Sequence, residues 1–133
     1  MPTLASLQPY ARSLLRIVAG FTFSLHGFQK LLGLFGGMGG KGMTASFPTL
    51  PWFAGSLELV GGMLLLVGLF SAPVAFLLSG QMAVAYFMYH YPRGFFPISN
   101  GGELSALYSF LFLYLSLAGP GPVSLDALVR KKG

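Results

Sequence analysis

Four apolar segments, each close to the length of a membrane span, dominate this chain; they cover residues of about 13–35, 52–71, 73–91 and 103–119. A spanning helix needs about 20 mostly apolar residues, so the fourth segment is at the short limit. Only 8% of the 133 residues are charged and 54% are hydrophobic, whereas soluble domains are about 25% charged. This composition excludes an ordinary soluble domain, a disordered chain and a coiled coil. No segment alternates as the strands of a membrane barrel do. The sequence therefore predicts an all-α fold: one domain, residues 1–133, built as an antiparallel four-transmembrane-helix bundle with a tail at 120–133.

The connections and the cations predict how this bundle is oriented. The second and third helices are joined by almost nothing, and the two longer loops, 36–51 and 92–102, fall on the opposite side from both termini. The side that holds the termini carries Arg12, Arg16, Arg130, Lys131 and Lys132. The side of the long loops carries Lys41 and Arg93, with Lys30 near the end of the first helix. Because cytoplasmic flanks are enriched in Lys and Arg, we expect cytoplasmic termini, with Arg12 and Arg16 as interface anchors. The net charge of +5 thus indicates topology and no nucleic-acid partner.

Ionisable side chains inside a span are costly and usually face the bundle interior. At 1.5 Å per residue, those of this chain converge on the half of the membrane nearest the long loops. On helical phase, the expected ligand-binding pocket consists of His26, Lys30, Glu58, Gln81 and Glu103, with Phe110 and Tyr114, which share the face of Glu103, as its lining. An α-helix places His90 about 180° from Gln81, so His90 is expected at the membrane interface.

A structural reading of these polar residues stands beside the functional one. Lys30 or a protonated His26 can pair with Glu58 and Glu103 simply to fix the register of the helices, and a binding site can reuse the same pairs. The chain has no cysteine, which excludes disulfides, thiolate catalysis and iron–sulfur clusters. A pair of histidines can hold a haem, but His26 and His90 differ in depth and in helical phase, which argues against a haem between them. No metal site and no catalytic residue is assigned.

Several motifs together resemble the DoxX family of small membrane proteins. In order along the chain they are His26-Gly27-x-x-Lys30, Glu58-x-x-Gly61-Gly62, Asn100-Gly101-Gly102-Glu103-Leu104 and Gly119-Pro120-Gly121-Pro122-Val123-Ser124-Leu125-Asp126. The resemblance implies a multi-pass protein of the bacterial or archaeal cytoplasmic (inner) membrane. The family takes its name from a subunit associated with a quinol oxidase, and relatives are linked to thiosulfate:quinone oxidoreduction. The polar residues at which this chain matches the family pattern are His26, Lys30, Glu58 and Glu103.

Two functions follow from these expectations. The first is a quinone- or quinol-linked component of a membrane oxidoreductase system, in which the pocket binds quinone as the only cofactor expected. Without residues for an electron carrier of its own, such a protein needs a partner subunit or a bound substrate to supply electrons. The second is a non-catalytic accessory or scaffold subunit of a larger respiratory or other membrane redox complex. In both, the lipid membrane and other subunits are the expected partners.

Overall fold

The computed structural model describes residues 3–132, with side chains through residue 130, and within that part every named element of secondary structure is helical. Its long helices are α1 (Gln8–Leu32), α2 (Leu50–Val67), α3 (Ser71–Ala85) and α5 (Glu103–Ala118). A π-helical turn, Tyr86–His90, and a 3-10 turn, Tyr91–Arg93, continue α3. The short elements are a 3-10 turn Ala5–Leu7, α4 (Pro97–Asn100) and α6 (Leu125–Lys132). The expected all-α class is confirmed. Two helical stretches, Leu50–Val67 and Ser71–Arg93, are long and apolar enough to cross a membrane.

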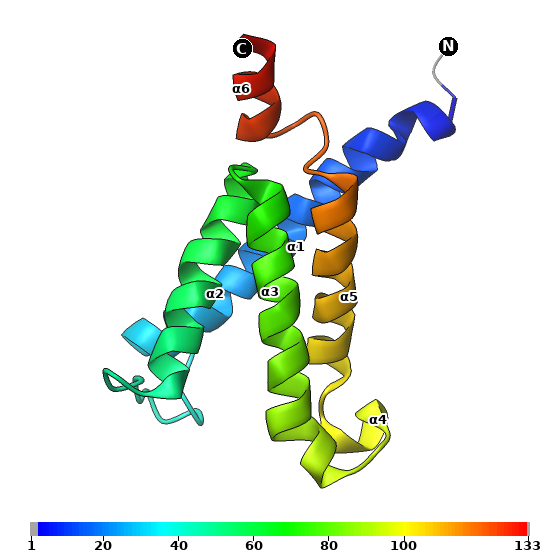
Figure 1. The fold of residues 1–133 in the computed structure, drawn as a ribbon. Coiled ribbons are helices and arrows are strands. Elements are labelled where there is room, and N and C mark those ends of the chain that lie inside the picture. Colours follow the sequence, from blue (N-terminus) through cyan, green and yellow to red (C-terminus); the bar gives the residue numbers. More distant parts are fainter. Residues whose placement is uncertain (1–2, 133) are drawn as a thin grey trace.

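The long helices pack as two pairs (Figure 1). α1 crosses the bundle obliquely and packs chiefly on α2, while α3 packs chiefly on α5. Both termini lie at one end of the bundle, hereafter the terminal end; the α1–α2 connection (33–49) and α4 lie at the other, hereafter the loop end. This arrangement agrees with the expectation that the two long loops share one side.

Glycines let α1 and α2 approach until their backbones touch. A Cβ atom on Gly20 would lie 2.6 Å from the backbone nitrogen of Leu66, and one on Gly62 would lie 2.7 Å from that of Ser24. Small residues at such positions are the usual means of close helix packing in membranes, where van der Waals contact replaces the hydrophobic driving force. The α3–α5 pair is held differently: Ser79 Oγ donates to Ser109 O (2.7 Å) and Ser109 Oγ donates back to Ser79 O (3.0 Å).

The helix ends differ from those expected by a few residues, for identifiable reasons. α1 stops at Leu32 and α2 at Val67 because Gly33 (φ 71°) and Gly68 (φ 75°) adopt the left-handed conformation that terminates helices. The short connection between α2 and α3 is therefore 68–70, and Ser71 already begins α3.

Arg16 is buried at the terminal end, which corrects its interpretation as an interface anchor. Its side chain is 1% exposed and donates hydrogen bonds to three backbone carbonyls: Nε to Leu65 O (2.8 Å), Nη2 to Val123 O (2.7 Å), and Nη1 to Pro120 O. These bonds tie α1 to the end of α2 and to the 119–124 turn. A buried guanidinium needs several hydrogen bonds of this kind, because each unmet N–H carries a desolvation cost.

Asp126 connects the tail to α3. Its carboxylate accepts hydrogen bonds from the backbone N–H groups of Phe70 and Ser71, both at 2.9 Å, and so satisfies free donors at the start of α3. Ser124 caps α6 itself, since its Oγ accepts from Ala127 N at 3.1 Å. Partial burial alone would raise the pKa of Asp126, but the N–H groups of Ser71 and Phe70 and the charge of Arg130 outweigh it and lower this pKa below its usual value.

Replacing Asp126 with Ala should lower the free energy of unfolding by about 1–2 kcal/mol, the usual value of a lost helix cap. Because the pKa of Asp126 is lowered in the folded protein, its contribution is complete above the ordinary carboxyl pKa of about 4 and is lost as the pH falls through the lowered value. Thermal unfolding in mild detergent at pH 7 and at progressively lower pH measures this. The difference between wild type and Asp126→Ala should shrink with acid. Glu103→Gln, an exposed carboxylate, is the control and should change little at either pH.

Candidate functional site

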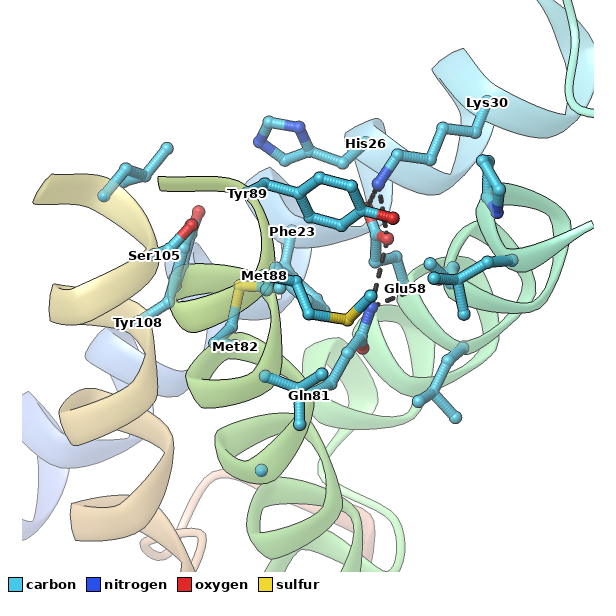
Figure 2. Close-up of a pocket in the computed structure, with 18 of the residues that line it drawn as sticks. Phe23, His26, Lys30, Glu58, Gln81, Met82, Met88, Tyr89, Ser105 and Tyr108 are labelled. Atoms are coloured by element: carbon cyan, nitrogen blue, oxygen red, sulfur yellow. Dashed lines mark hydrogen bonds and ion pairs between the residues drawn. The ribbon is translucent and has the colours of Figure 1, made fainter. Parts of the chain in front are cut away.

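A cavity of about 840 Å³ lies between the two helix pairs in the half of the bundle nearest the loop end. Its wall is mostly apolar, with contributions from α1, α2, α3 and α5. Lys30 and Gln81 meet Glu58 on one side of the cavity, whereas Ser105 and Tyr108 lie across it on α5 (Figure 2). The polar side chains on the wall are His26, Lys30, Glu58, Gln81, Tyr89, His90, Ser105 and Tyr108.

Glu58 is the centre of the polar group. Its carboxylate is 1% exposed and accepts from Lys30 Nζ at both oxygens, at 2.8 Å to Oε1 and 2.7 Å to Oε2. Gln81 Nε2 donates to the same Oε2 at 3.1 Å. One carboxylate thus joins α1, α2 and α3 (Figure 2). The Lys30 side chain is 29% exposed, so the buried ion pair has its cationic side toward the open space.

Another glycine of the α1–α2 interface places this ion pair. Gly55 stands one turn before Glu58, and a Cβ there would lie 2.9 Å from the Cβ of Lys30. Because α1 can come this close, the lysine side chain extends along α2 and ends on the carboxylate. Gln81 reaches the same atom from α3, and its Oε1 is buried with no hydrogen-bond partner in the described chain. The amide nitrogen must face the carboxylate, which only accepts, so an acceptor is left without a donor.

The structure brings together four of the five predicted polar residues. His26, Lys30, Glu58 and Gln81 all line the cavity. Glu103 is exposed at the start of α5 and lies outside it, as do Phe110 and Tyr114. α5 instead presents Leu104, Ser105 and Tyr108 to the cavity and packs Tyr108, Phe112 and Leu115 into the core. Two residues along a helix turn about 200°, so the face with Phe110 and the face with Tyr108 are opposite.

His90 lines the cavity, whereas a regular helix would have put it at the interface. The cause is the π-helical turn at Tyr86–His90, which is wider than an α-turn and changes the direction of the following side chains. His90 Nδ1 is 3.2 Å from the backbone oxygen of Asn100. The buried Asn100 side chain in turn donates to Gly94 O (2.9 Å) and Tyr86 OH (3.1 Å). His90 is thereby fixed between the cavity and the 94–102 loop.

Tyr108 is a cavity residue that the sequence analysis missed. Its hydroxyl lies 2.7 Å from Thr22 Oγ1. Its ring packs edge-on against Phe23, with 5.2 Å between the ring centroids, and stacks on Phe112, with 5.3 Å between the centroids. The signal for it was present in the spacing of Tyr108, Phe112 and Leu115, which is that of a buried helix face.

The DoxX family model matches residues 11–91 of the chain. The chain belongs to the DoxX family. A Haemophilus influenzae protein of uncharacterized function is 45% identical over 135 residues, an alignment that covers 99% of this chain and all of that relative. No solved structure matches the chain. DoxX proteins are membrane proteins, so a lipid bilayer is the environment of this bundle, and its exposed apolar side chains are those that lipid can cover.

The family match spans the two residues of the ion pair and Gln81, whereas α5, which forms one wall of the cavity, follows the matched segment. Within the described residues of this DoxX chain, no group of three or more His, Cys, Asp or Glu side chains is arranged to hold a metal ion. The chemistry of the cavity is therefore that of a cation, a buried carboxylate, an amide and two imidazoles.

The two halves of the ion pair should differ in their effect on stability. Lys30→Met leaves the 1% exposed carboxylate of Glu58 without its cation, which costs about 3–5 kcal/mol for a buried pair. Glu58→Gln leaves a lysine that is partly exposed to the cavity, so its effect should be smaller. Chemical unfolding of both variants in mild detergent measures the difference. The double variant Lys30→Met/Glu58→Gln should recover much of the loss of Lys30→Met. Equal losses in the two single variants would show that the carboxylate is not the buried partner.

Proposed function

We propose that this DoxX protein binds the headgroup of a quinone or quinol in the cavity and acts as a quinone-linked component of a membrane oxidoreductase system. The observation that carries the proposal is the unused hydrogen-bonding capacity of Lys30. An ammonium has three donors, and two of them meet the two oxygens of Glu58. The third has no partner among the described residues and can donate to an acceptor in the cavity, such as a quinone carbonyl oxygen.

The rest of the wall suits a flat, mostly apolar ring. Aromatic side chains of Phe23, Tyr89 and Tyr108 border the space (Figure 2), and ligand sites are generally apolar with few polar groups that fix orientation. His26, one turn before Lys30, lines the same end and can donate to or accept from a second oxygen. Gln81 Oε1, which has no partner among the described residues, is an acceptor available to the hydroxyl of a reduced ring.

The residues of this chain bind and orient such a ligand, and electrons come from outside it. The chain has no cysteine to hold an iron–sulfur cluster, so the proposed role depends on a partner subunit or a bound electron donor. Glu58 holds the Lys30 ammonium in place, because both of its carboxylate oxygens accept hydrogen bonds from it.

The site test compares bound quinone in variants that remain folded. Lys30→Met/Glu58→Gln removes the donor and its counter-charge together and leaves no lone buried ion. Quinone that co-purifies in mild detergent is extracted and quantified by mass spectrometry, and binding of a tail-less benzoquinone is titrated directly. Loss of one hydrogen bond to a charged group, worth about 1.5–3 kcal/mol, should weaken binding about tenfold or more.

Arg12→Gln, at the terminal end, is the matched control and should bind normally. Equal quinone occupancy in the double variant and the wild type would contradict the proposal. The accessory-subunit function would then lead.

We also propose four membrane spans, α1, α2, α3 with its extension, and α5, with both termini in the cytoplasm of a bacterial or archaeal cell. At 1.5 Å per residue, α1 is about 37 Å long and so is long enough to cross while tilted, as its oblique course suggests (Figure 1). The cations at the terminal end, which include Arg12, Arg16 and Arg130, support this orientation by the positive-inside rule.

Topology reporters test this orientation. A fusion at Lys41 should report outside, whereas fusions at Leu69 in the α2–α3 turn and at the C-terminus should report the cytoplasm. The reason is that the chain crosses the membrane once with each of the four spans. A reporter active only outside when placed at the C-terminus would reverse the orientation. It would also move the cavity to the cytoplasmic half.

The alternative function, a non-catalytic accessory subunit of a larger redox complex, is favoured by the loop that precedes and contains α4. Phe95, Phe96 and Ile98 on it are 72%, 65% and 85% exposed. Apolar side chains gathered on a loop that extends from the bundle (Figure 1) suit contact with another subunit.

A further inference from the structure

The cavity reaches the apolar surface of the bundle between α2 and α3. Several of its lining side chains are also among the exposed apolar residues of the protein surface, which a closed cavity would not allow. Those between α2 and α3 are Leu50 on α2 and Phe76, Leu77 and Val84 on α3; nearer the loop end, Met88, Tyr89 and Leu104 also line the cavity and are exposed. α2 and α3 separate as they run from their short turn toward the loop end (Figure 1), since α2 packs chiefly on α1 and α3 chiefly on α5.

Gly80 lies in this opening and differs from the other helical glycines. Gly20, Gly55 and Gly62 lie against a neighbouring helix, so that a Cβ would collide with it, whereas a Cβ on Gly80 would meet nothing within 4 Å. Its exposed position needs neither a positive φ nor close packing. Glycine in a helix interior is unfavourable by up to about 1 kcal/mol relative to alanine, so its small size has to be accounted for in another way.

Gly80 lines the cavity next to its polar end. The next residue is Gln81, which donates to Glu58. A molecule with its polar group at Lys30 and its apolar part directed past Gly80 would leave the bundle between Leu77 and Val84, where lipid covers the surface.

From this geometry we infer that the ligand is an amphiphile with a long apolar tail, isoprenoid or alkyl, which enters sideways from the bilayer and leaves its tail in the α2–α3 opening. This inference rests on the proposed function for its polar headgroup and adds the tail and the route. A water-soluble ligand would make no favourable contact with an opening lined by the apolar side chains of Leu50, Phe76 and Leu77.

The experiment fills the opening and leaves the polar end unchanged. In lipid nanodiscs, Gly80→Leu is compared with the wild type for binding of a polyprenyl benzoquinone and of its tail-less analogue. Gly80→Leu should weaken binding of the tailed quinone about tenfold, as expected when a side chain occupies required space, and change that of the tail-less one less than twofold. Ala72→Leu, an exposed addition on the same helix but outside the cavity, should change neither.

A second measurement does not depend on folding of the variant. A quinone with a photoreactive group on its tail should label the α2 and α3 residues of the opening in the wild-type protein, as identified by mass spectrometry. Normal binding of the tailed quinone in Gly80→Leu, or labelling confined to other faces, would overturn the proposed route. The proposed function would still stand in that case if Lys30→Met/Glu58→Gln weakened quinone binding. Failure of the wild type to bind either quinone would overturn both.

Discussion

Backbone contact between α1 and α2 is the constraint on which the rest of the structure depends. Because Gly20 and Gly62 remove side chains from the interface, these two helices pack as one unit. α3 and α5 form a second unit through the reciprocal bonds of Ser79 and Ser109. The two units meet closely near the α2–α3 turn and separate toward the loop end (Figure 1). The cavity is the space that this separation leaves, so it is a consequence of how the helices pair.

Polar groups at the two ends of the bundle do different work, although each end contains a buried ion. At the terminal end, Arg16 donates to the carbonyls of Leu65, Pro120 and Val123 and is 1% exposed. Arg16 also lines a smaller pocket of about 450 Å³, but its guanidinium is occupied by these backbone acceptors, so Arg16 serves to join segments. At the loop end, the buried charge is Glu58, and its cation Lys30 is partly exposed to a large cavity. An ion pair that only joined helices would not require a cation exposed to a cavity. We therefore prefer the binding interpretation for the Lys30–Glu58 pair and not for Arg16.

Much of the helical fold and of the polar cluster could be predicted from the sequence, because apolar length and intramembrane charge are strong signals. The wrong side of α5 was chosen because both of its faces are apolar, one toward lipid and one toward protein, so Phe110 and Phe112 look alike in the sequence. Arg16 was misplaced for a different reason. Its partners are backbone carbonyls of α2 and of a Gly-Pro turn, and no side chain in the sequence marks them.

His90 shows a third kind of limit, because its position depends on a change of helix type. Nine steps of about 100° put it opposite Gln81 in a regular helix, but the π-helical turn advances less per residue and returns it to the cavity. π-turns of this kind occur often at functional sites. The same turn brings His90 Nδ1 to Asn100 O, at the end of the loop with the exposed aromatic side chains. A subunit seated on that loop would therefore touch the segment that fixes one wall of the cavity, so that a binding role and an accessory role can share one structural element.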